Sequence, residues 1–440
     1  MSPPSGKGKD AKALLQKTIR SFLNCGGPPY LILDTRPRRI FCARHLSPST
    51  NIPLHRLDGS WFKLPAKQTP FAVLESPQED TTDGQDDEFK KLERSDPRAD
   101  QFGRQIRSSN ILKSRGYRTE WTFEDHPLFW TTFAEELSLS SMNRDPGQHT
   151  QPALEIIDGS KPSKERYNFL FQPNPILVKI LPTVERELLA SRSTQQAKSP
   201  HGSNLLRCLD VGCGAGRDMI YMVARSANGL AINGAEWSAL GMDQREDMCG
   251  LGQQLVDDTF FQDPGEHIDA KITDPGMELA TRVGFLVGKV DSESGVFWVS
   301  SPSSIPSHPQ GKAGPLRLQN IRYHDVVLDQ QQQQLLGSAA ATETKDQRFD
   351  LIIMIRFLQR SLFAPLVENW LRPGGFIILS TFVSDKDLPQ YSKPGPAHRL
   401  QSRSEASDIF ESLGLNIVSE EVSLIEDGRR PVATVVARKP

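Results

Sequence analysis

The C-terminal half of the chain switches repeatedly between short apolar runs and segments with helical spacing. Leu205–Val211 is typical of a buried strand, and Arg217–Ala224 has the composition and spacing of a helix. Two further apolar runs, Trp237–Asp243 and Arg348–Ile355, predict two more strands. Strands that alternate with helices in this way indicate an α/β fold with a mainly parallel sheet.

A helix over 362–371 is expected next along the chain. It should stop at Arg372-Pro-Gly-Gly375, because proline and glycine end helices, and Phe376–Phe382 is the next predicted strand. Two insertions in this half, Ser300–Pro315 and Gln330–Gln334, have compositions that cannot bury much apolar surface. We expect both to be surface loops.

The first part of the chain predicts a smaller α/β unit. Its expected elements are a helix at 11–23, strands at 30–34, 70–74 and 117–123, and a helix at 108–115. Arg44–Pro53 is predicted to be a turn-rich connection and Glu75–Glu88 an acidic loop. The basic helix at 11–23 also fits an organelle-targeting segment, but its apolar spacing favours an ordinary first helix.

The chain has 440 residues, more than one hydrophobic core usually serves. We therefore predict a domain over residues 12–135, a polar linker over 136–165 and a larger domain over 166–440. The net charge of −2 gives no global signature of nucleic-acid or anionic-membrane binding. No apolar run approaches the roughly 20 residues of a membrane span, and the first residues lack an apolar signal core.

The five cysteines show no paired spacing, which favours a reducing, cytoplasmic location and predicts no metal site. One of them, Cys213, lies inside the sequence LDVGCGAGRD at 209–218. A redox or nucleophilic role for Cys213 needs a neighbouring histidine or cationic base, and none is evident locally.

The three glycines of that sequence, Gly212, Gly214 and Gly216, fall between a predicted strand and a predicted helix. Such a turn lets a ligand approach the backbone and faces it with helix N–H groups. The spacing is neither that of dinucleotide folds nor that of a phosphate-binding loop with its lysine. Asp210 repels phosphate and favours a cationic group, such as the methionine part of S-adenosylmethionine. The alternative is a purely structural turn.

Two more residues stand at predicted strand ends. Asp243 ends the second strand, where an open α/β sheet presents a carboxylate to ribose hydroxyls, although an aspartate after a strand also serves as a helix cap. Arg356 follows the 348–355 strand at the edge that carries ligands. It is the candidate catalytic residue, expected to orient an anionic or oxyanion acceptor. An ion pair with a loop acid is the alternative.

At these residues the chain from about Tyr167 to Lys439 resembles class I S-adenosylmethionine-dependent methyltransferases. The matching pieces are LDVGCGAGRD, WSALGMD, RFDLIIMIRFLQRSLF and LRPGGFIILSTF. The Gly-Arg-Asp ending and RFLQRSLF resemble the branch with tellurite-resistance-type methyltransferases. The resemblance implies a Rossmann-like seven-stranded sheet closed by an antiparallel hairpin over 415–439.

The same resemblance implies site residues. Asp210 and the three glycines would hold the methionine moiety of S-adenosylmethionine, and Asp243 its ribose. The adenine-contacting acid is assigned to Asp291, with Asp325 as the competing choice.

Residues 12–135 are similar to a rhodanese domain in the pieces Leu33-Asp-Thr-Arg36, Arg44–Pro53 and Phe71–Leu74. A rhodanese carries its sulfur-transferring cysteine in the loop after the strand equivalent to Phe71–Leu74. Here that loop begins Glu75-Ser-Pro-Gln-Glu-Asp80 and contains no cysteine. Since an acidic loop opposes thiolate and persulfide, we interpret this unit as a non-catalytic rhodanese-like module for docking or support, through which a protein partner would bind.

The leading hypothesis is an S-adenosylmethionine-dependent methyltransferase that acts on a small molecule or an unidentified acceptor. A second is an RNA (tRNA) methyltransferase, with the basic, aromatic Lys113–Trp121 as part of its nucleic-acid footprint. A third is a non-enzymatic scaffold that retains both folds. No membrane partner is expected.

Overall fold

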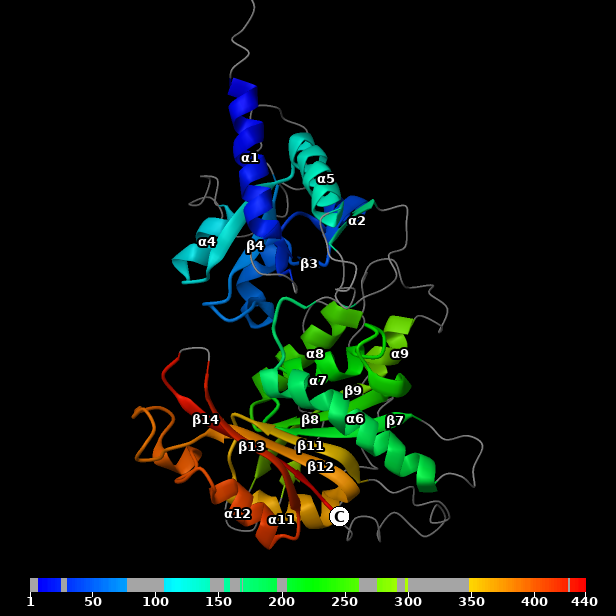
Figure 1. Cartoon of the computed structure of the whole chain (residues 1–440), viewed down its shortest axis with the longest axis vertical. Coiled ribbons are helices and arrows are strands. Elements are labelled where there is room, and N and C mark those ends of the chain that lie inside the picture. Colours follow the sequence, from blue (N-terminus) through cyan, green and yellow to red (C-terminus); the bar gives the residue numbers. More distant parts are fainter. Residues whose placement is uncertain are drawn as a thin grey trace, which may run out of the picture. The chain divides into compact units, whose positions relative to one another are not determined.

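The computed structural model contains two compact units, Met1–Phe171 and Gln172–Pro440 (Figure 1). It describes residues 7–24, 30–76, 107–142, 154–158, 167, 169–195, 204–260, 275–290, 297–299, 348–425 and 428–440. The predicted insertions at 300–315 and 330–334, and nearly all of the acidic loop after Glu75, lie outside these residues.

The first unit is built on a parallel sheet of four strands in the order β3-β1-β4-β5. The strands are β1 (Ile32–Asp34), β3 (Thr50–Asn51), β4 (Phe71–Glu75) and β5 (Thr119–Glu124). The helices are α1 (Lys7–Leu23), α2 (Arg38–Ala43), α4 (Ser108–Ser114) and α5 (Pro127–Met142), with 3₁₀ turns η1 (Leu54–Gly59) and η2 (Trp61–Lys63). The three strands and two helices predicted from the sequence are all present.

Alternate residues of these strands pack into two cores, one on each face of the sheet. Ala72 and Leu74 of β4 share a cluster with Phe22 of α1 and Phe133 of α5. Phe71 and Val73 belong to the opposite cluster, with residues of α4 and η1. The sheet is thus covered on both faces, as expected for parallel strands.

Two segments predicted to be irregular form a ribbon instead. Arg44–Ser47 is strand β2, and it pairs antiparallel with β6 (Glu155–Asp158). The prediction of a turn-rich connection is therefore wrong over β2, and that of a linker over 136–165 is wrong over β6. The physical reason is burial: Leu46 is fully buried and lies opposite Ile156, which packs against the same cluster.

The predicted linker is also wrong at its start, because α5 continues to Met142. Leu137 packs against the core of the first unit, and Glu136 binds Arg20 of α1 through hydrogen bonds of 2.7 and 2.9 Å. These tertiary contacts extend the helix into a stretch whose composition suggests a linker.

The second unit contains an eight-stranded sheet in the order β10-β9-β8-β7-β11-β12-β14-β13. Its strands are β7 (Leu205–Val211), β8 (Glu236–Asp243), β9 (Val283–Val290), β10 (Phe297–Val299), β11 (Phe349–Ile355), β12 (Leu371–Phe382), β13 (Asn416–Leu424) and β14 (Pro431–Arg438). Five neighbouring strands, in the order β9-β8-β7-β11-β12, are parallel to one another. The expected antiparallel hairpin closes one side, with β14 inserted between β12 and β13. β10 is an additional antiparallel strand at the other side.

Helices cover both faces of this sheet. Figure 1 shows α6 (Pro175–Gln195), α7 (Arg217–Ala224) and α8 (Glu246–Phe260) on one face, and α11 (Phe363–Pro365) and α12 (Glu405–Ser412) on the other. The remaining elements are α9 (Pro275–Thr281), the 3₁₀ turns η4 (Ile232–Gly234), η8 (Arg360–Leu362) and η10 (Pro396–His398), and the π-helical turn η9 (Leu366–Trp370). No helix among the described residues has the length and apolar character needed to cross a bilayer.

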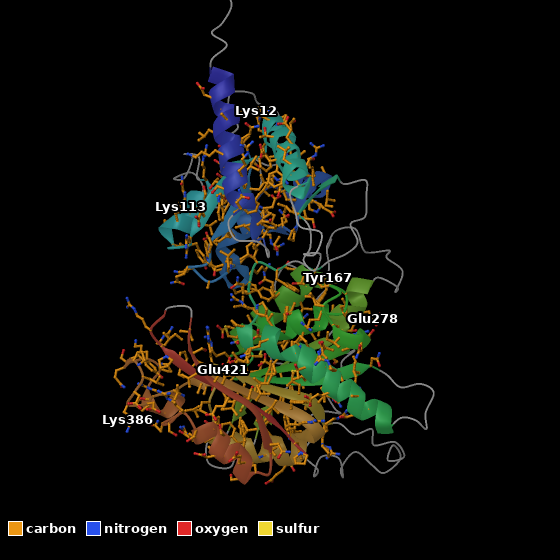
Figure 2. All side chains as sticks on the ribbon, viewed as in Figure 1. Lys12, Lys113, Tyr167, Glu278, Lys386 and Glu421 are labelled. Carbon is orange, nitrogen blue, oxygen red and sulfur yellow. The ribbon has the colours of Figure 1, made fainter. Side chains whose placement is uncertain are left out.

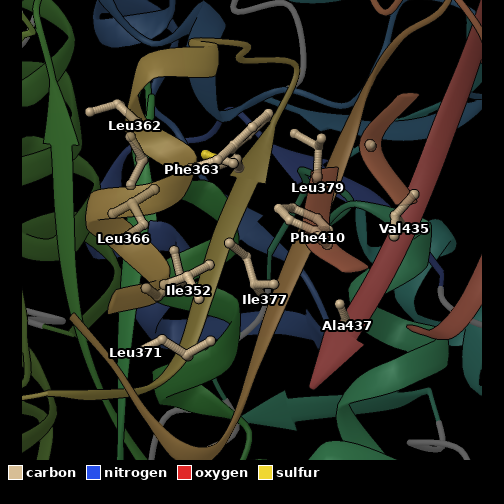
Figure 3. Close-up of a cluster of buried hydrophobic side chains, with 14 of the residues drawn as sticks. Ile352, Leu362, Phe363, Leu366, Leu371, Ile377, Leu379, Phe410, Val435 and Ala437 are labelled. Atoms are coloured by element: carbon tan, nitrogen blue, oxygen red, sulfur yellow. The ribbon is translucent and has the colours of Figure 1, made fainter. Parts of the chain in front are cut away.

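The core on the α11 and α12 face is shown in Figure 3. Ile352, Ile377 and Leu379 of the parallel strands meet Val435 and Ala437 of the hairpin. The rings of Phe363 and Phe410 lie edge to face over them, with centroids 5.3 Å apart. Each such large apolar side chain contributes about 1.5–3 kcal/mol when fully buried. This packing fixes the strands whose carboxyl ends form the site described below.

The predicted helix over 362–371 is broken into η8, α11 and η9, and β12 begins at Leu371, before the Pro-Gly-Gly sequence. Lys439 accounts for part of the difference, since its Nζ donates to the carbonyl oxygens of Val367 and Leu371, at 2.5 and 3.0 Å. Backbone carbonyls that a regular helix would satisfy internally are bound here by a side chain 68 or more residues away.

A buried glutamate attaches α6 to the sheet. Glu185 is fully buried and accepts hydrogen bonds from Arg225 (2.8 and 3.0 Å), the amide of Ile232 (3.0 Å) and the indole of Trp237 (2.9 Å). Its carboxylate is fully satisfied, which is the condition for a buried charge to be tolerated.

Candidate functional site

The turn between β7 and α7 is built on glycines in the left-handed backbone region. Gly212, Gly214 and Gly216 have φ angles of 78°, 54° and 67°, which residues with a Cβ rarely adopt. The turn is attached to the next strand because the amides of Gly212 and Cys213 donate to the carbonyl of Met242, at 2.7 and 3.1 Å. The predicted strand-to-helix glycine turn is therefore present.

Neighbouring side chains leave no room for a larger residue at two of these positions. A Cβ at Gly212 would lie 2.6 Å from Phe357, and one at Gly216 would lie 2.6 Å from Phe285. At Gly214 the only near atom among the described residues is Cε of Met248, at 3.4 Å. The middle of the turn is thus its most open part.

Asp210 is the second-last residue of β7, and only the buried Val211 separates it from the turn. Asp210 is only 3% exposed, and none of the described residues donates a hydrogen bond to its carboxylate. Burial raises the pKa of Asp210 well above its ordinary value, and the charges of Asp218 and Asp243 raise it further. A buried carboxylate without donors is unfavourable, so this position favours a ligand that brings donors or positive charge.

Asp243 ends β8 and holds the turn in place. Its Oδ2 accepts a hydrogen bond from the amide of Gly214, and its Oδ1 accepts one from the amide of Arg245, both at 2.9 Å. Each carboxylate oxygen has a further lone pair that can accept another hydrogen bond. The structure therefore brings Asp243 to the glycine turn.

Asp218 is a third acid at this place. It is the last residue of LDVGCGAGRD, and no binding role was predicted for it. It lies in the first turn of α7, and its Oδ1 accepts a hydrogen bond of 2.7 Å from the amide of Asn174, just before α6. Burial raises the pKa of Asp218, while the Asn174 amide and the charges of Arg217 and Arg356 oppose the rise. Asp218 comes close to Asp210 because the turn between β7 and α7 is short. The predicted strand, turn and helix could therefore have indicated this third acid.

Arg356 leaves β11 at the same edge of the sheet. Its side chain is exposed, its amide donates to the carbonyl of Ser380 at 2.7 Å, and its φ is 56°. A non-glycine residue in this conformation is strained, and such residues cluster at functional sites. The charge of Arg356 lowers the pKa of Asp218, against the larger effect of burial.

Cys213 has a sulfur neighbour that the sequence did not indicate. The contact with Cys249 of α8, burial and the charge of Asp210 all raise the pKa of the Cys213 thiol well above its ordinary value. Since the thiolate is the reactive form, Cys213 is poorly suited to nucleophilic chemistry. This agrees with its interpretation as a small residue in the turn.

The two candidates for the adenine-contacting acid, Asp291 and Asp325, lie outside the described residues. Asp291 would directly follow β9, which ends at Val290. Phe357 and Phe285 flank the glycines, and their place at the turn was not predicted from the sequence. Only the folded sheet brings their strands beside the turn.

In the first unit, Glu75 ends β4 where a sulfur-transferring loop would begin. It is 5% exposed, and its Oε2 accepts hydrogen bonds from the hydroxyl of Ser108 (2.7 Å) and the amide of Ser109 (3.3 Å) at the start of α4. Ser108 also contacts Thr35, with 2.9 Å between the hydroxyl oxygens. A carboxylate thus occupies the donors that could otherwise bind an anion.

No family model matches the chain. It is similar to uncharacterized protein UNK4.09 of Schizosaccharomyces pombe, with 28% identity over 433 residues that cover 98% of this chain and 97% of that protein. The similarity extends over both units.

Solved methyltransferase structures are similar to part of the chain. One is 1,6-didemethyltoxoflavin-N1-methyltransferase of Burkholderia thailandensis (16% identity, 58% of this chain, 88% of that chain, TM-score 0.29). Another is magnesium protoporphyrin IX methyltransferase of Synechocystis PCC 6803 (14% identity, 61% and 89% covered, TM-score 0.29). Both contain bound S-adenosylhomocysteine. The fold described above rests on the strand order of this chain.

Proposed function

We propose that the Gln172–Pro440 unit is an S-adenosylmethionine-dependent methyltransferase of class I. The observation that carries the proposal is the Asp210 carboxylate, which is buried, lacks donors and lies with Asp218 and Asp243 around an open glycine turn. Three acids, at the ends of β7 and β8 and at the start of α7, repel phosphate and attract a cation. A cationic amino-acid nucleoside fits this combination of charge and open backbone.

The sheet supports the same proposal. Its parallel strands and its closing antiparallel hairpin have the arrangement that the resemblance to class I methyltransferases implies. Ligands of open α/β sheets bind outside the carboxyl ends of the strands, which is where the acids lie. Asp210 and the glycines would hold the methionine moiety, Asp243 the ribose, and Asp291 or Asp325 the adenine.

S-adenosylmethionine, when bound, supplies a methyl group on a sulfonium that a nucleophile displaces. The chain then has to hold the acceptor in line and close, which alone gives much of the acceleration in such reactions. Arg356 is the residue proposed to orient an anionic or oxyanion acceptor, since it emerges beside the cofactor edge. The narrower assignment to the tellurite-resistance-type branch rests on the Gly-Arg-Asp ending, where Asp218 joins the acid cluster.

For the Met1–Phe171 unit we propose a non-catalytic, rhodanese-like module that docks a partner protein or supports the enzyme. The parallel sheet and the buried Glu75, with its bonds to Ser108 and Ser109, support this. A thiosulfate sulfurtransferase assay on the full chain should show no turnover. Robust turnover would refute the assignment.

A second candidate function, RNA (tRNA) methylation, is favoured by one surface of the same unit. The rings of Trp61 and Tyr117 stack at 6.0 Å, with Arg115 over Trp61 (4.3 Å) and Lys67 over Tyr117 (5.6 Å). Aromatic rings among cations are the usual platform for single-stranded nucleic acid. In this case the first unit would hold the RNA substrate.

The test is binding of labelled S-adenosylmethionine to the full chain. We expect micromolar affinity in the wild type and none in Asp210→Ala, while Arg186→Ala, at an exposed position of α6, binds normally. Absence of binding to the wild type would indicate the third hypothesis, a scaffold without enzymatic activity. Incubation with cell extract separated into RNA, protein and small molecules then shows which fraction receives the label.

A further inference from the structure

We propose that the methyl acceptor carries a carboxylate or phosphate group, and that Arg399 binds this group beside the end of β12. The proposal rests on the methyltransferase function proposed above and names the substrate class: a small acidic molecule. Its basis is a buried arginine that has no carboxylate partner among the residues that the structure describes, in a segment attached to the carboxyl end of β12.

The segment between β12 and α12 leaves the sheet and returns to it. The amide of Leu400 donates a hydrogen bond to the carbonyl oxygen of Phe382 at 2.8 Å. The amide of Ser384 donates one to the carbonyl oxygen of Leu400 at 2.7 Å. Residue 399 is therefore fixed beside the carboxyl end of β12. Figure 2 labels Lys386 within this segment and Glu421 on β13. Since β12 is two strands away from β7, about 10 Å separate the two strands laterally.

Arg399 itself is 7% exposed. Its Nη1 donates to the carbonyl of Tyr391 at 3.0 Å and its Nη2 to that of Ser392 at 3.4 Å. Its Nε is buried and has no hydrogen-bond partner among the described residues. Carbonyl groups do not neutralise the charge, and a buried cation without an anion is costly. An anionic ligand would supply the missing charge.

The nearby acids are bound to other arginines. Asp385 lies 3.5 Å from Nε of Arg403, and Glu405 lies 2.5 Å from Nε of Arg360. Neither is paired with Arg399 in the structure. The segment therefore holds a guanidinium whose counter-charge must come from elsewhere.

Aromatic rings and a second arginine complete the surroundings. The Arg399 guanidinium lies 4.5 Å from the centre of the Tyr391 ring, which is tilted against Phe382 at 6.2 Å. Arg430, from the β13–β14 hairpin, lies 5.2 Å from the Phe382 ring. Burial raises the pKa of Tyr391, and the charges of both arginines oppose the rise, so both act on the same place. Arg399 and Arg430 beside the rings of Tyr391 and Phe382 suit a planar acidic molecule, because the cations attract its charge and the rings can stack on it.

The acids around the glycine turn and the pair Arg399 and Arg430 lie at different parts of this edge, and Asp385 and Glu405, which lie near Arg399, are paired with Arg403 and Arg360. The acids Asp210, Asp218 and Asp243 lie at the ends of β7 and β8 and the start of α7, and the arginines lie beyond β12. A cationic cofactor and an anionic acceptor would each be drawn to its own part of the edge. A lateral separation of about 10 Å between the two strands suits an acceptor of small-molecule size.

Two probes, benzoate and inorganic phosphate, test the proposal by calorimetric titration of the full chain saturated with S-adenosylhomocysteine. We expect one or both to bind the wild type and the charge-matched control Arg186→Met equally. Affinity should fall about tenfold or more in Arg399→Met, and in Arg430→Met if Arg399→Met fails to fold. Arg399→Lys should retain part of the affinity because it keeps the charge.

Cofactor affinity, measured in the same variants, separates this proposal from the proposed function. Unchanged S-adenosylhomocysteine binding with no binding of either probe to the wild type would overturn the acceptor class alone. Equal probe binding by wild type and Arg399→Met would do the same. Binding of a single-stranded RNA oligonucleotide but of neither probe would replace the small acid with a nucleic acid. If the wild type does not bind the cofactor at all, the methyltransferase assignment itself is refuted.

Discussion

The carboxylate of Asp243, at the end of β8, accepts a hydrogen bond of 2.9 Å from the amide of Gly214, in the turn that follows β7. One side chain thus connects two neighbouring strand ends and orders the glycine turn. If the site binds S-adenosylmethionine, the same carboxylate has to serve the turn and the ribose together.

Asp243→Asn should therefore weaken both stability and cofactor binding. The asparagine amide has one acceptor oxygen for two amide donors, Gly214 and Arg245, so one hydrogen bond to a charged group is lost, at about 1.5–3 kcal/mol. Thermal melting and cofactor titration measure the two effects. Asp247→Asn, at an exposed acid paired with Arg245, is the matched control and should change stability little, because solvent screens the pair. Equal effects of both variants would contradict this account.

Gly212→Ala should destabilise the protein more than Gly229→Ala. Both glycines have positive φ, 78° and 68°, so alanine costs about 1–2 kcal/mol at either one. At Gly212 the new methyl group also lies 2.6 Å from Phe357, whereas at Gly229 no atom of the described residues lies within 4 Å. Overpacking adds about 1–3 kcal/mol at Gly212. Denaturant unfolding compares the two, and equal losses would mean that Phe357 moves aside.

Asp210→Asn should raise the melting temperature at neutral pH and abolish cofactor binding. Because the pKa of Asp210 is raised in the folded chain, the native state binds this proton more tightly than the unfolded state. Stability is thus highest below the ordinary aspartate pKa of about 4 and falls as pH rises through the raised value. Asparagine does not ionise, so the variant does not lose this stability as the pH rises.

Melting scans from pH 4 to pH 8 test this prediction. The two proteins should melt alike at the acid end, and the variant should melt higher at the alkaline end, by about 2–4 °C for each kcal/mol of stability regained. Saturating S-adenosylmethionine should stabilise only the wild type. A variant that is less stable than the wild type at every pH would contradict the conclusion that burial of the charged Asp210 carboxylate destabilises the protein.

Glu185→Ala should cost about 3–5 kcal/mol, because it leaves the buried Arg225 without its partner. Glu187→Ala, two residues along α6, breaks a half-exposed pair with Arg438 and should cost less than about 1 kcal/mol. Chemical denaturation measures both. The double variant Glu185→Leu with Arg225→Met should recover much of the loss; failure to recover would point to the bonds with Ile232 and Trp237 as the main contribution.

The local part of the site is readable from the sequence. Leu205–Val211 and Arg217–Ala224 form the strand and helix with the predicted bounds. Their apolar periodicity and the glycines between them are signals within one short stretch, so Asp210 and the turn could be placed without the rest of the fold.

What the sequence did not reveal depends on residues far apart in the chain. Phe357 lies against Gly212 only because β11 is next to β7 in the sheet. The pairing of β2 with β6 joins segments more than a hundred residues apart, and both look irregular when read alone. The buried Arg399 has no recognisable pattern in the sequence, since the lack of a partner for its Nε among the described residues is visible only in three dimensions.

The left-handed backbone of Arg356 has a consequence for engineering. A glycine would adopt its φ of 56° without strain, so Arg356→Gly would relieve up to about 1–3 kcal/mol of backbone energy. A procedure that scores substitutions on folding energy alone would recommend this change and remove the charge that we propose to orient the acceptor. Screens for more heat-resistant variants should therefore keep this position fixed and measure turnover alongside melting.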